Sequence, residues 1–387
     1  MQQKNMKKRI CRVLLWAVTL AVAVTSVGFT GKMLKDLALL PGNMEGKSSD
    51  AIGCEIMDRY DMYVTNALSS ALEGIVVIDR VYWLSDSDQV APEPDQSKFG
   101  QTDDPSTLGW LLEDAAMLLD GQETLFSTDL QQAAGTPVRY YLDDTILAIT
   151  WKIPINGTMY TISEVKIAHP SQLRRFLAGG AYGSPIQLTT TEMAASVNAV
   201  VASSGDFYAF RRYGVIVYDG TVQRVNCEKV DTCYINDQGE MLFSYRGELP
   251  DVEAAQAFVD ANNIRYSVAF GPVLIDGGAC KDFSGYVLGE VTARYARAAL
   301  CQMGQLHYLL VTAWKEGACQ TALTVKEMQQ QLAAFGCEKA YALDGGQTAV
   351  IVHNDELVNA VVYGEQRNIS DIIYFATALP NEEKDTE

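Results

Sequence analysis

The sequence contains little histidine and little positive charge. Only three of its 387 residues are histidines, and 30 Lys and Arg residues stand against 48 Asp and Glu residues, giving a formal net charge of -18. A chain this acidic binds nucleic acid poorly, because such binding needs Lys and Arg side chains that neutralise phosphates. We therefore expect no nucleic-acid partner. Apolar residues nevertheless make up 48% of the chain, which is enough to form a folded core.

Several motifs of known chemistry are also missing from the sequence. No Cys-x-x-Cys pair and no Cys/His cluster has the spacing of a zinc site, so we expect no metal ion. No Gly-x-x-x-x-Gly-Lys-[Ser/Thr] segment indicates nucleotide binding, and no Ser/His/Asp or Cys/His arrangement indicates acyl transfer. We expect no bound cofactor.

The first thirty residues differ from the rest of the chain. Several basic residues and no acidic one lie between Lys4 and Arg12, and residues 13–31 carry no charge. This run is close to the roughly 20 residues that a membrane-spanning helix needs, and the basic flank favours a cytoplasmic N-terminus. We predict a cytoplasmic tail at 1–12 and a transmembrane anchor at 13–31 in a single-pass bacterial membrane protein whose C-terminal domain is extracellular. The alternative is a cleaved signal peptide, which exports the body as well.

The chain after this anchor divides into two parts. Residues 32–136 contain a linker with Pro, Gly and Ser and a polar acidic loop, and we interpret them as a juxtamembrane and accessory segment. From residue 137 onward, short runs rich in Tyr, Ile, Thr and Val predict strands, two of which meet at a hairpin turn, Asn156–Gly157. We predict an α+β fold with a mixed-sheet body at 137–380 and an acidic tail at 381–387.

Several helix starts can be recognised within the body. Thr189 with Glu192 and Thr324 with Glu327 have the spacing of a capping box, and Asp251 is a favourable N-cap. Each precedes a segment without strand-like alternation. These starts predict helices that interrupt the series of strands, as an α+β fold requires.

Two cysteines lie close together in the part of the chain that we expect to be exported. Cys227 and Cys233 occupy one polar stretch between strand-like runs. Because disulfides form in exported proteins, we predict a disulfide between them. Cys301 and Cys337 have apolar neighbours, and we interpret them as small core residues.

Five short segments follow one another in the second half of the chain. They are Ala202–Tyr208 (Ala-Ser-Ser-Gly-Asp-Phe-Tyr), Tyr213–Gly220, Arg297–Gln302 (Arg-Ala-Ala-Leu-Cys-Gln), Leu343–Ala349 (Leu-Asp-Gly-Gly-Gln-Thr-Ala) and Glu365–Asp371. In order and spacing, the set resembles the motifs of the phosphodiester glycosidase family over roughly residues 160–380. The sequence departs from the family pattern at Ser204, Cys301, Ala313–Trp314, Gln347 and Thr348.

The resemblance implies the fold of that family and a site for a sugar phosphodiester. Paired carboxylates perform glycoside hydrolysis, and the candidate catalytic residues in these motifs are Asp206, Asp344 and Glu365. Arg side chains suit phosphate oxygens because the guanidinium group is a planar fork of donors, and the N–H groups of a tight Gly turn can approach an anion. The candidates for substrate and phosphate binding are Ser204, Gly205, Arg297, Gly345, Gly346, Thr348 and Arg367. We expect the two groups to converge on one pocket.

The scarcity of histidine favours cleavage of the sugar C–O bond of such a substrate over cleavage of its P–O bond. Cleavage of the C–O bond at the sugar releases a phosphate monoester, which is a good leaving group without an acid, and needs a carboxylate and an activated water. We therefore expect hydrolysis of a sugar-phosphodiester bond in an extracellular glycan or glycoconjugate. The alternative is a non-catalytic cell-surface protein of the same fold, which binds a glycan or acts in exopolysaccharide assembly.

Overall fold

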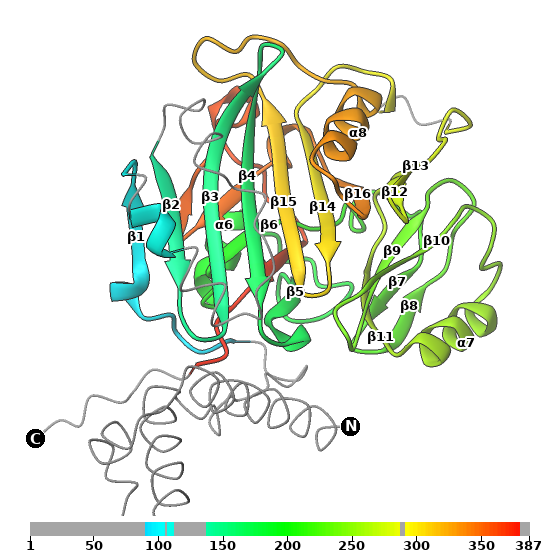
Figure 1. Ribbon diagram of the computed structural model, residues 1–387. Coiled ribbons are helices and arrows are strands. Elements are labelled where there is room, and N and C mark those ends of the chain that lie inside the picture. The colour runs from blue at the N-terminus through cyan, green and yellow to red at the C-terminus, as the bar shows by residue number, and fades with distance from the viewer. Residues whose placement is uncertain (1–89, 105–106, 112–136, 287–290, 380–387) are drawn as a thin grey trace, which may run out of the picture. The chain divides into compact units, whose positions relative to one another are not determined.

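The computed structural model describes residues 90–104, 107–111, 137–286 and 291–379 (Figure 1). The predicted tail and anchor at 1–31, most of the accessory segment and the acidic tail at 381–387 lie outside these residues. Within the described ranges, no helix is both long enough and apolar enough to cross a membrane.

The largest element of the fold is a nine-stranded sheet (Figure 1). In spatial order its strands are β1 (Phe99–Thr102), β2 (Val138–Leu142), β3 (Ile146–Ile155), β4 (Thr158–Ile167), β15 (His307–Trp314), β14 (Arg297–Gly304), β16 (Lys339–Leu343), β12 (Val273–Asp276) and β13 (Ala279–Cys280). Strand β1 comes from the segment before residue 137, and it pairs with β2 at the edge of this sheet.

Smaller sheets complete the strand arrangement. A five-stranded sheet has the order β18 (Glu356–Leu357), β17 (Ile351–His353), β6 (Val201–Ser204), β19 (Asp371–Phe375) and β5 (Leu173–Leu177). A three-stranded sheet contains β10 (Met241–Ser244), β9 (Thr232–Asn236) and β11 (Ile264–Val268), and β7 (Ile216–Tyr218) pairs with β8 (Thr221–Arg224). Strands dominate and helices are few, which confirms the α+β prediction. The named strand pairs of the described residues are all antiparallel, whereas we predicted a mixed-sheet body.

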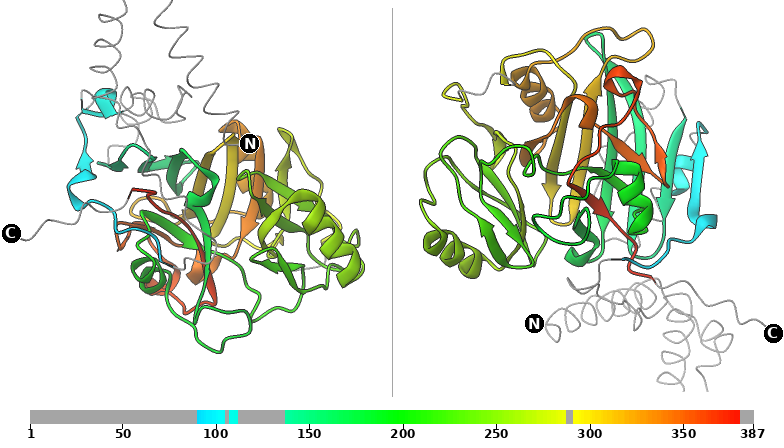
Figure 2. Two further views of the ribbon diagram at one scale, coloured as in Figure 1. Left: turned by 90° about the horizontal axis from the view of Figure 1, so that it is seen from below. Right: turned by 180° about the vertical axis from the view of Figure 1, so that it is seen from behind.

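The two larger sheets pack face to face around a shared apolar core. Leu300 and Tyr341 of the nine-stranded sheet belong to the same buried cluster as Ile351 and Phe375 of the five-stranded sheet. Helix α8 (Val325–Ala334) covers the other face of the nine-stranded sheet, and α6 (Thr190–Ser196) covers the other face of the five-stranded sheet (Figure 2). The strand ends between these layers are therefore held on a rigid scaffold.

The local signals in the sequence occur where we predicted them. Thr189 and Thr324 close capping boxes at the starts of α6 and α8, and Asp251 accepts from Ala254 N–H at the start of α7 (Val252–Asn262). The turn between β3 and β4 has positive φ at Asn156 and Gly157. Short 3-10 helices complete the elements: η1 (Gln96–Lys98), η2 (Pro170–Gln172), η4 (Gly346–Thr348) and η5 (Val362–Gly364).

The predicted disulfide between Cys227 and Cys233 is wrong. Both cysteines are free and buried. Cys227 packs with the apolar residues under α7, and its thiol donates to the Leu249 carbonyl at 2.8 Å. Cys233 lies on β9, and its side chain packs in the core between the two larger sheets. The two thiols therefore belong to different apolar clusters.

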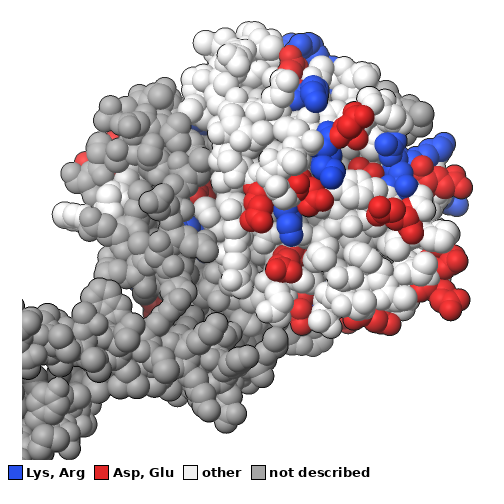
Figure 3. All heavy atoms as spheres, turned by 45° about the vertical axis from the view of Figure 1, so that its right-hand side comes forward, with Lys and Arg blue, Asp and Glu red and all other residues white. Residues whose placement is uncertain are grey.

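The surface around the small sheets is acidic. Figure 3 shows Asp and Glu side chains spread over this side of the molecule, with Lys and Arg interspersed at its upper part. On α7 itself, the exposed charged side chains include Glu253 and Asp260. This surface agrees with the acidic composition of the sequence.

Candidate active site

Three turns at strand ends carry most of the predicted site residues. The first follows β6 and begins at Gly205, the second comprises residues 344–348 after β16, and the third is the segment before β19. Strands β6 and β19 are neighbours, with Ser204 opposite Ile372. Turns of this kind, on a packed scaffold, are common positions for functional side chains.

Asp344 and Arg367 form an ion pair at the centre of the candidate site. Nη2 of Arg367 lies 2.7 Å from Oδ2 of Asp344. The Asp344 side chain is buried, whereas 37% of the Arg367 side chain is exposed. Burial raises the pKa of Asp344 to about 6, although the charge of Arg367 acts in the opposite direction. A carboxyl group that titrates near neutrality beside an exposed guanidinium group is suited to proton transfer.

Aromatic rings hold Arg367 beside this carboxyl group. Its guanidinium carbon lies 5.0 Å from the ring centroid of Phe207 and 5.4 Å from that of Phe210, and the two rings stack with centroids 5.0 Å apart. Such cation–π contacts fix the position of a guanidinium group. Phe210 is 47% exposed. The ring pair therefore also gives the site an apolar surface.

Arg211 adds a second positive charge. Its guanidinium carbon lies 4.5 Å from the ring centroid of Phe270, and Nη2 donates to the Phe270 carbonyl oxygen at 2.6 Å. Burial raises the pKa of Asp344, and the charge of Arg211 is one of the effects that oppose this rise. Two guanidinium groups near one carboxyl group make the site suited to an anion such as a phosphodiester.

A second charged cluster is fully buried. Nε of Arg175, on β5, donates to Oδ2 of Asp371 at 2.8 Å, and its Nη2 lies 3.6 Å from Oδ2 of Asp206. Burial raises the pKa of Asp371 to about 6, with the charge of Arg175 opposing this rise and that of Asp206 adding to it. One guanidinium group is thus shared by two buried carboxyl groups.

The Asp206 carboxylate accepts hydrogen bonds from backbone N–H groups and does not face solvent. Its side chain is completely buried, Oδ2 accepts from Ala269 N–H at 2.7 Å and Oδ1 accepts from Phe207 N–H at 2.5 Å. The residue after Ala269 is Phe270, whose ring contacts the guanidinium group of Arg211. The ring of Phe207 contacts the guanidinium group of Arg367. Asp206 therefore helps to position Phe207 and Phe270, the two rings that contact these guanidinium groups. Our prediction of a catalytic role for Asp206 does not fit its burial.

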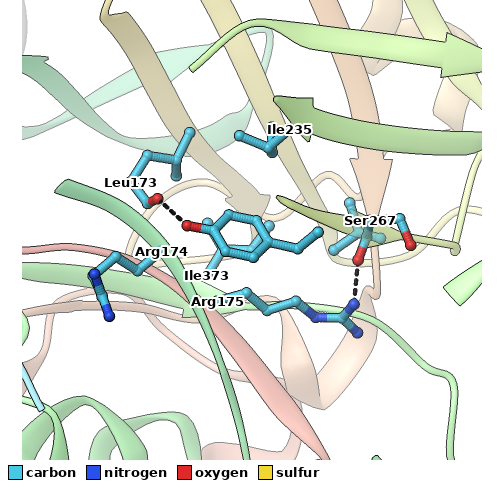
Figure 4. A pocket seen from close by; sticks show the side chains of 8 residues that line it. Leu173, Arg174, Arg175, Ile235, Ser267 and Ile373 are labelled. Carbon is cyan, nitrogen blue, oxygen red and sulfur yellow. Dashed lines mark hydrogen bonds between the residues drawn. The ribbon is translucent and has the colours of Figure 1, made fainter. Parts of the chain in front are cut away.

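A small pocket lies next to this buried cluster (Figure 4). It is lined by Leu173, Arg174, Arg175, Ile235, Tyr266, Ser267, Val268 and Ile373. Figure 4 shows Arg175 extending to the carbonyl oxygen of Ser267. The Tyr266 hydroxyl donates to the carbonyl oxygen of Leu173 at 2.7 Å. Most of the lining is apolar and neither Asp344 nor Arg367 contributes to it. Within the described residues, no group of three His, Cys, Asp or Glu side chains is arranged to hold a metal ion.

The glycine turn after β16 is close-packed. A Cβ at Gly345 would lie 2.5 Å from the Ala296 carbonyl oxygen, so only glycine fits there. The N–H of Gly346 donates to that same carbonyl at 3.0 Å, and the Thr348 hydroxyl donates to the Gly345 carbonyl at 2.8 Å. The Gly346 N–H and the Thr348 hydroxyl thus have internal partners, and these residues shape the turn that presents Asp344.

Three other predicted residues stand apart from the ion pair. Arg297 is buried and donates to the carbonyl oxygens of Leu323, at 3.1 Å, and Ala293. Glu365 is exposed, and its carbonyl oxygen accepts from Gln347. The Ser204 hydroxyl is buried and has no hydrogen-bond partner in the part of the chain that the structure describes. Of the two arginines predicted to bind phosphate, Arg367 contacts Asp344 and Arg297 binds backbone carbonyls instead.

Several residues that shape the site were not predicted from the sequence, among them Arg175, Arg211, Phe270 and Asp371. Asp371 is the last residue of the fifth motif segment, so the resemblance contained a signal for it. Arg211 follows the first segment closely, where a basic residue beside Phe207 and Phe210 was a signal as well. Nothing local marks Arg175 or Phe270, because their partners are distant in sequence.

The sequence of this region matches a known family. Residues 197–376 match the family model described as phosphodiester glycosidase. This part of the chain is a phosphodiester glycosidase domain. The domain contains Asp206, Asp344, Arg367 and Asp371, and the match supports a function of the phosphodiester glycosidase type. Arg175 precedes the matched range, although its strand β5 pairs with β19.

Several solved structures resemble the chain at low sequence identity. A hypothetical protein from Synechocystis has a TM-score of 0.49 and 15% identity, covering 62% of this chain and 63% of its own length. The catalytic domain of zebrafish N-acetylglucosamine-1-phosphodiester alpha-N-acetylglucosaminidase, auto-inhibited by its pro-peptide, has a TM-score of 0.47 and 16% identity, covering 60% and 83%. A putative exported protein from Burkholderia pseudomallei K96243 has a TM-score of 0.38 and 14% identity, covering 57% and 74%. A search of the curated proteins finds no match.

Proposed function

We propose that this protein hydrolyses a sugar-phosphodiester bond in an extracellular glycan or glycoconjugate. The observation that carries the proposal is the contact between Asp344 and Arg367, in which a carboxyl group of raised pKa lies 2.7 Å from the guanidinium group of a partly exposed arginine. The phosphodiester glycosidase domain match supports the class of reaction. No histidine is needed for this chemistry.

In the proposed reaction, Arg367 and Arg211 bind the phosphate oxygens. When phosphate oxygens accept hydrogen bonds from Arg367, the attraction between this guanidinium group and Asp344 weakens. The carboxylate of Asp344 then becomes a stronger base. Asp344 then accepts a proton from a water whose oxygen attacks the anomeric carbon. The C–O bond to phosphate breaks, and the phosphate monoester leaves with the electron pair.

One observation favours a second candidate function. Paired carboxylates act in most glycoside hydrolysis, yet Asp206 is fully buried and holds backbone N–H groups. A site in which Asp344, paired with the partly exposed Arg367, is the carboxyl group nearest the phosphate-binding arginine is also compatible with a protein that binds a glycan phosphodiester without cleaving it. The non-catalytic alternative, in glycan binding or exopolysaccharide assembly, therefore remains the competitor of the hydrolase.

Turnover separates these two functions. The detergent-extracted full chain is incubated with a panel of sugar-1-phosphodiesters in water enriched in oxygen-18, and Asp344→Asn serves as the matched variant. Hydrolysis with the label in the released sugar supports C–O cleavage, and label in the phosphate contradicts it. Binding without turnover supports the second function.

We also propose that residues 13–31 anchor the body at the outer face of a bacterial cell membrane. The basic cluster before this uncharged run supports the orientation. Fractionation and N-terminal sequencing of the mature protein test the anchor. A mature chain that begins near Lys32 contradicts the anchor and still agrees with export.

A further inference from the structure

A pair of partly exposed aromatic side chains lies at the ends of β14 and β15. Tyr295, just before β14, is 41% exposed, and Trp314 is the half-buried last residue of β15. Their ring centroids are 6.1 Å apart with an interplanar angle of 61°. Large aromatic side chains are normally buried, and a pair on the surface beside a candidate site is typical of a binding surface.

This pair borders the candidate site directly. A Cβ on Gly346 would lie 2.5 Å from Cε1 of Tyr295, so the Tyr295 ring occupies the space against this glycine. Gly346 is two residues from Asp344, and its N–H donates to the Ala296 carbonyl next to Tyr295. The Tyr295 ring therefore packs against the turn that carries Asp344.

The Asp344 turn also has aromatic rings associated with Arg367. Phe207 and Phe210 stack with each other and with the guanidinium group of Arg367. One aromatic pair therefore contacts Arg367, and the other pair, through Tyr295, packs on the glycine turn that follows Asp344. A flat ring face matches the apolar C–H face of a sugar ring.

We propose that the Tyr295–Trp314 pair is a second sugar-binding subsite, so that the substrate is a chain of sugars joined through phosphodiester bonds. The inference rests on the proposed function, in which Arg367 binds the phosphate. A phosphate within such a chain has a sugar on each side. One sugar stacks on the exposed ring of Phe210, and the other on Tyr295 and Trp314.

The position of Lys315 agrees with this ligand. Its ammonium nitrogen lies 5.6 Å from the ring centroid of Trp314, at the subsite. In a chain that is acidic as a whole, a cation beside an exposed aromatic pair matches a ligand that carries repeated negative charges. A neutral polysaccharide would not use this charge.

The test compares binding of a short and a long ligand. The probes are the methyl phosphodiester of glucose 1-phosphate and a linear trimer of glucose 1-phosphate, with matched pairs built from mannose and N-acetylglucosamine. Calorimetry is performed on the full chain with Asp344→Asn, so that no probe is cleaved. We expect the trimer of at least one sugar to bind about 10-fold more tightly than the methyl diester, as one additional stacked ring predicts.

The variants assign this preference to the subsite. Tyr295→Ala and Trp314→Ala are expected to abolish the preference for the trimer, whereas Tyr295→Phe, which keeps the ring, retains it. Trp110→Ala removes an aromatic side chain that is 70% exposed outside the site, and this control is expected to keep the preference. Melting temperatures verify that each variant is folded.

A preference for the trimer that survives in Tyr295→Ala and Trp314→Ala overturns the proposal, and so does the absence of any preference across the three sugars. The assay measures binding, so it is independent of turnover. A protein that prefers the trimer through Tyr295 but does not hydrolyse it disproves the hydrolase and keeps the subsite.

Discussion

Gly205 lies directly against the carboxylate of Asp371, and a Cβ at this position would overlap Oδ2 of that carboxylate. The contact matters because the same carboxylate accepts from the N–H of Asp206 and binds Arg175. The small size of Gly205 therefore allows the buried charged cluster to hold the turn after β6. That turn carries Phe207, on which Arg367 lies.

Gly205→Ala is expected to destabilise the protein because the methyl group has no space beside Asp371. The free energy of unfolding should fall by roughly 1–3 kcal/mol, as for other overpacked sites. Urea unfolding measures the change. Gly304→Ala is the matched control, since no atom lies within 4 Å of a Cβ built there. Equal stability of the two variants would show that the turn after β6 can move away from Asp371.

Asp344→Asn is expected to remove the proposed base. We expect the rate of hydrolysis to fall roughly 100-fold or more, with little change in substrate affinity, because the amide cannot accept the proton. Steady-state kinetics with the best substrate of the panel gives kcat and KM. Loss of affinity with unchanged kcat would instead assign Asp344 to substrate binding.

The rate of hydrolysis should depend on pH through Asp344. Its pKa is raised to about 6 by burial, and only the ionised form accepts a proton, so kcat/KM should rise with pH up to about 6 and then level off. Arg367 counteracts the rise of this pKa, so Arg367→Gln should move the acidic limb to higher pH. An acidic limb at the same pH in Arg367→Gln would mean that another group titrates.

Stability should also change with pH because of the buried Asp371. Its pKa in the folded protein is about 6, above the ordinary value of 3.8, so the folded state binds more protons than the unfolded state between these values. The contribution of Asp371 to stability is therefore greatest below pH 4 and declines, by roughly 1–3 kcal/mol, as pH rises to about 6. Urea unfolding from pH 4 to 7 measures the decline. Asp371→Asn should flatten it, and an unchanged slope would assign the decline to other groups.

Cysteine labelling tests the absence of a disulfide between Cys227 and Cys233. Both thiols are buried and should react with an alkylating agent only after unfolding, whereas Cys280 is exposed and should react in the folded protein. Mass spectrometry of unreduced peptides identifies each product. A peptide pair linked through Cys227 and Cys233 would contradict the observed packing of the two thiols.

The sequence predicted those features that depend on neighbouring residues. The caps at Thr189, Asp251 and Thr324 and the turn at Asn156–Gly157 involve hydrogen bonds and backbone angles within a few residues, so composition and spacing sufficed. The motif segments similarly marked the turns at the ends of β6 and β16, because a turn requires particular residue types.

The tertiary structure alone decided which of the marked residues meet. Asp206 and Asp344 look equivalent in sequence, yet the packing of β5 against β19 buries Asp206 beside Arg175 and leaves Asp344 beside an exposed Arg367. Arg297 looked like a phosphate ligand, but its donors reach two backbone carbonyls. The packing of strands that are distant in sequence decides whether a charged side chain is buried and which partner it contacts. Local residue patterns contain no information on that packing.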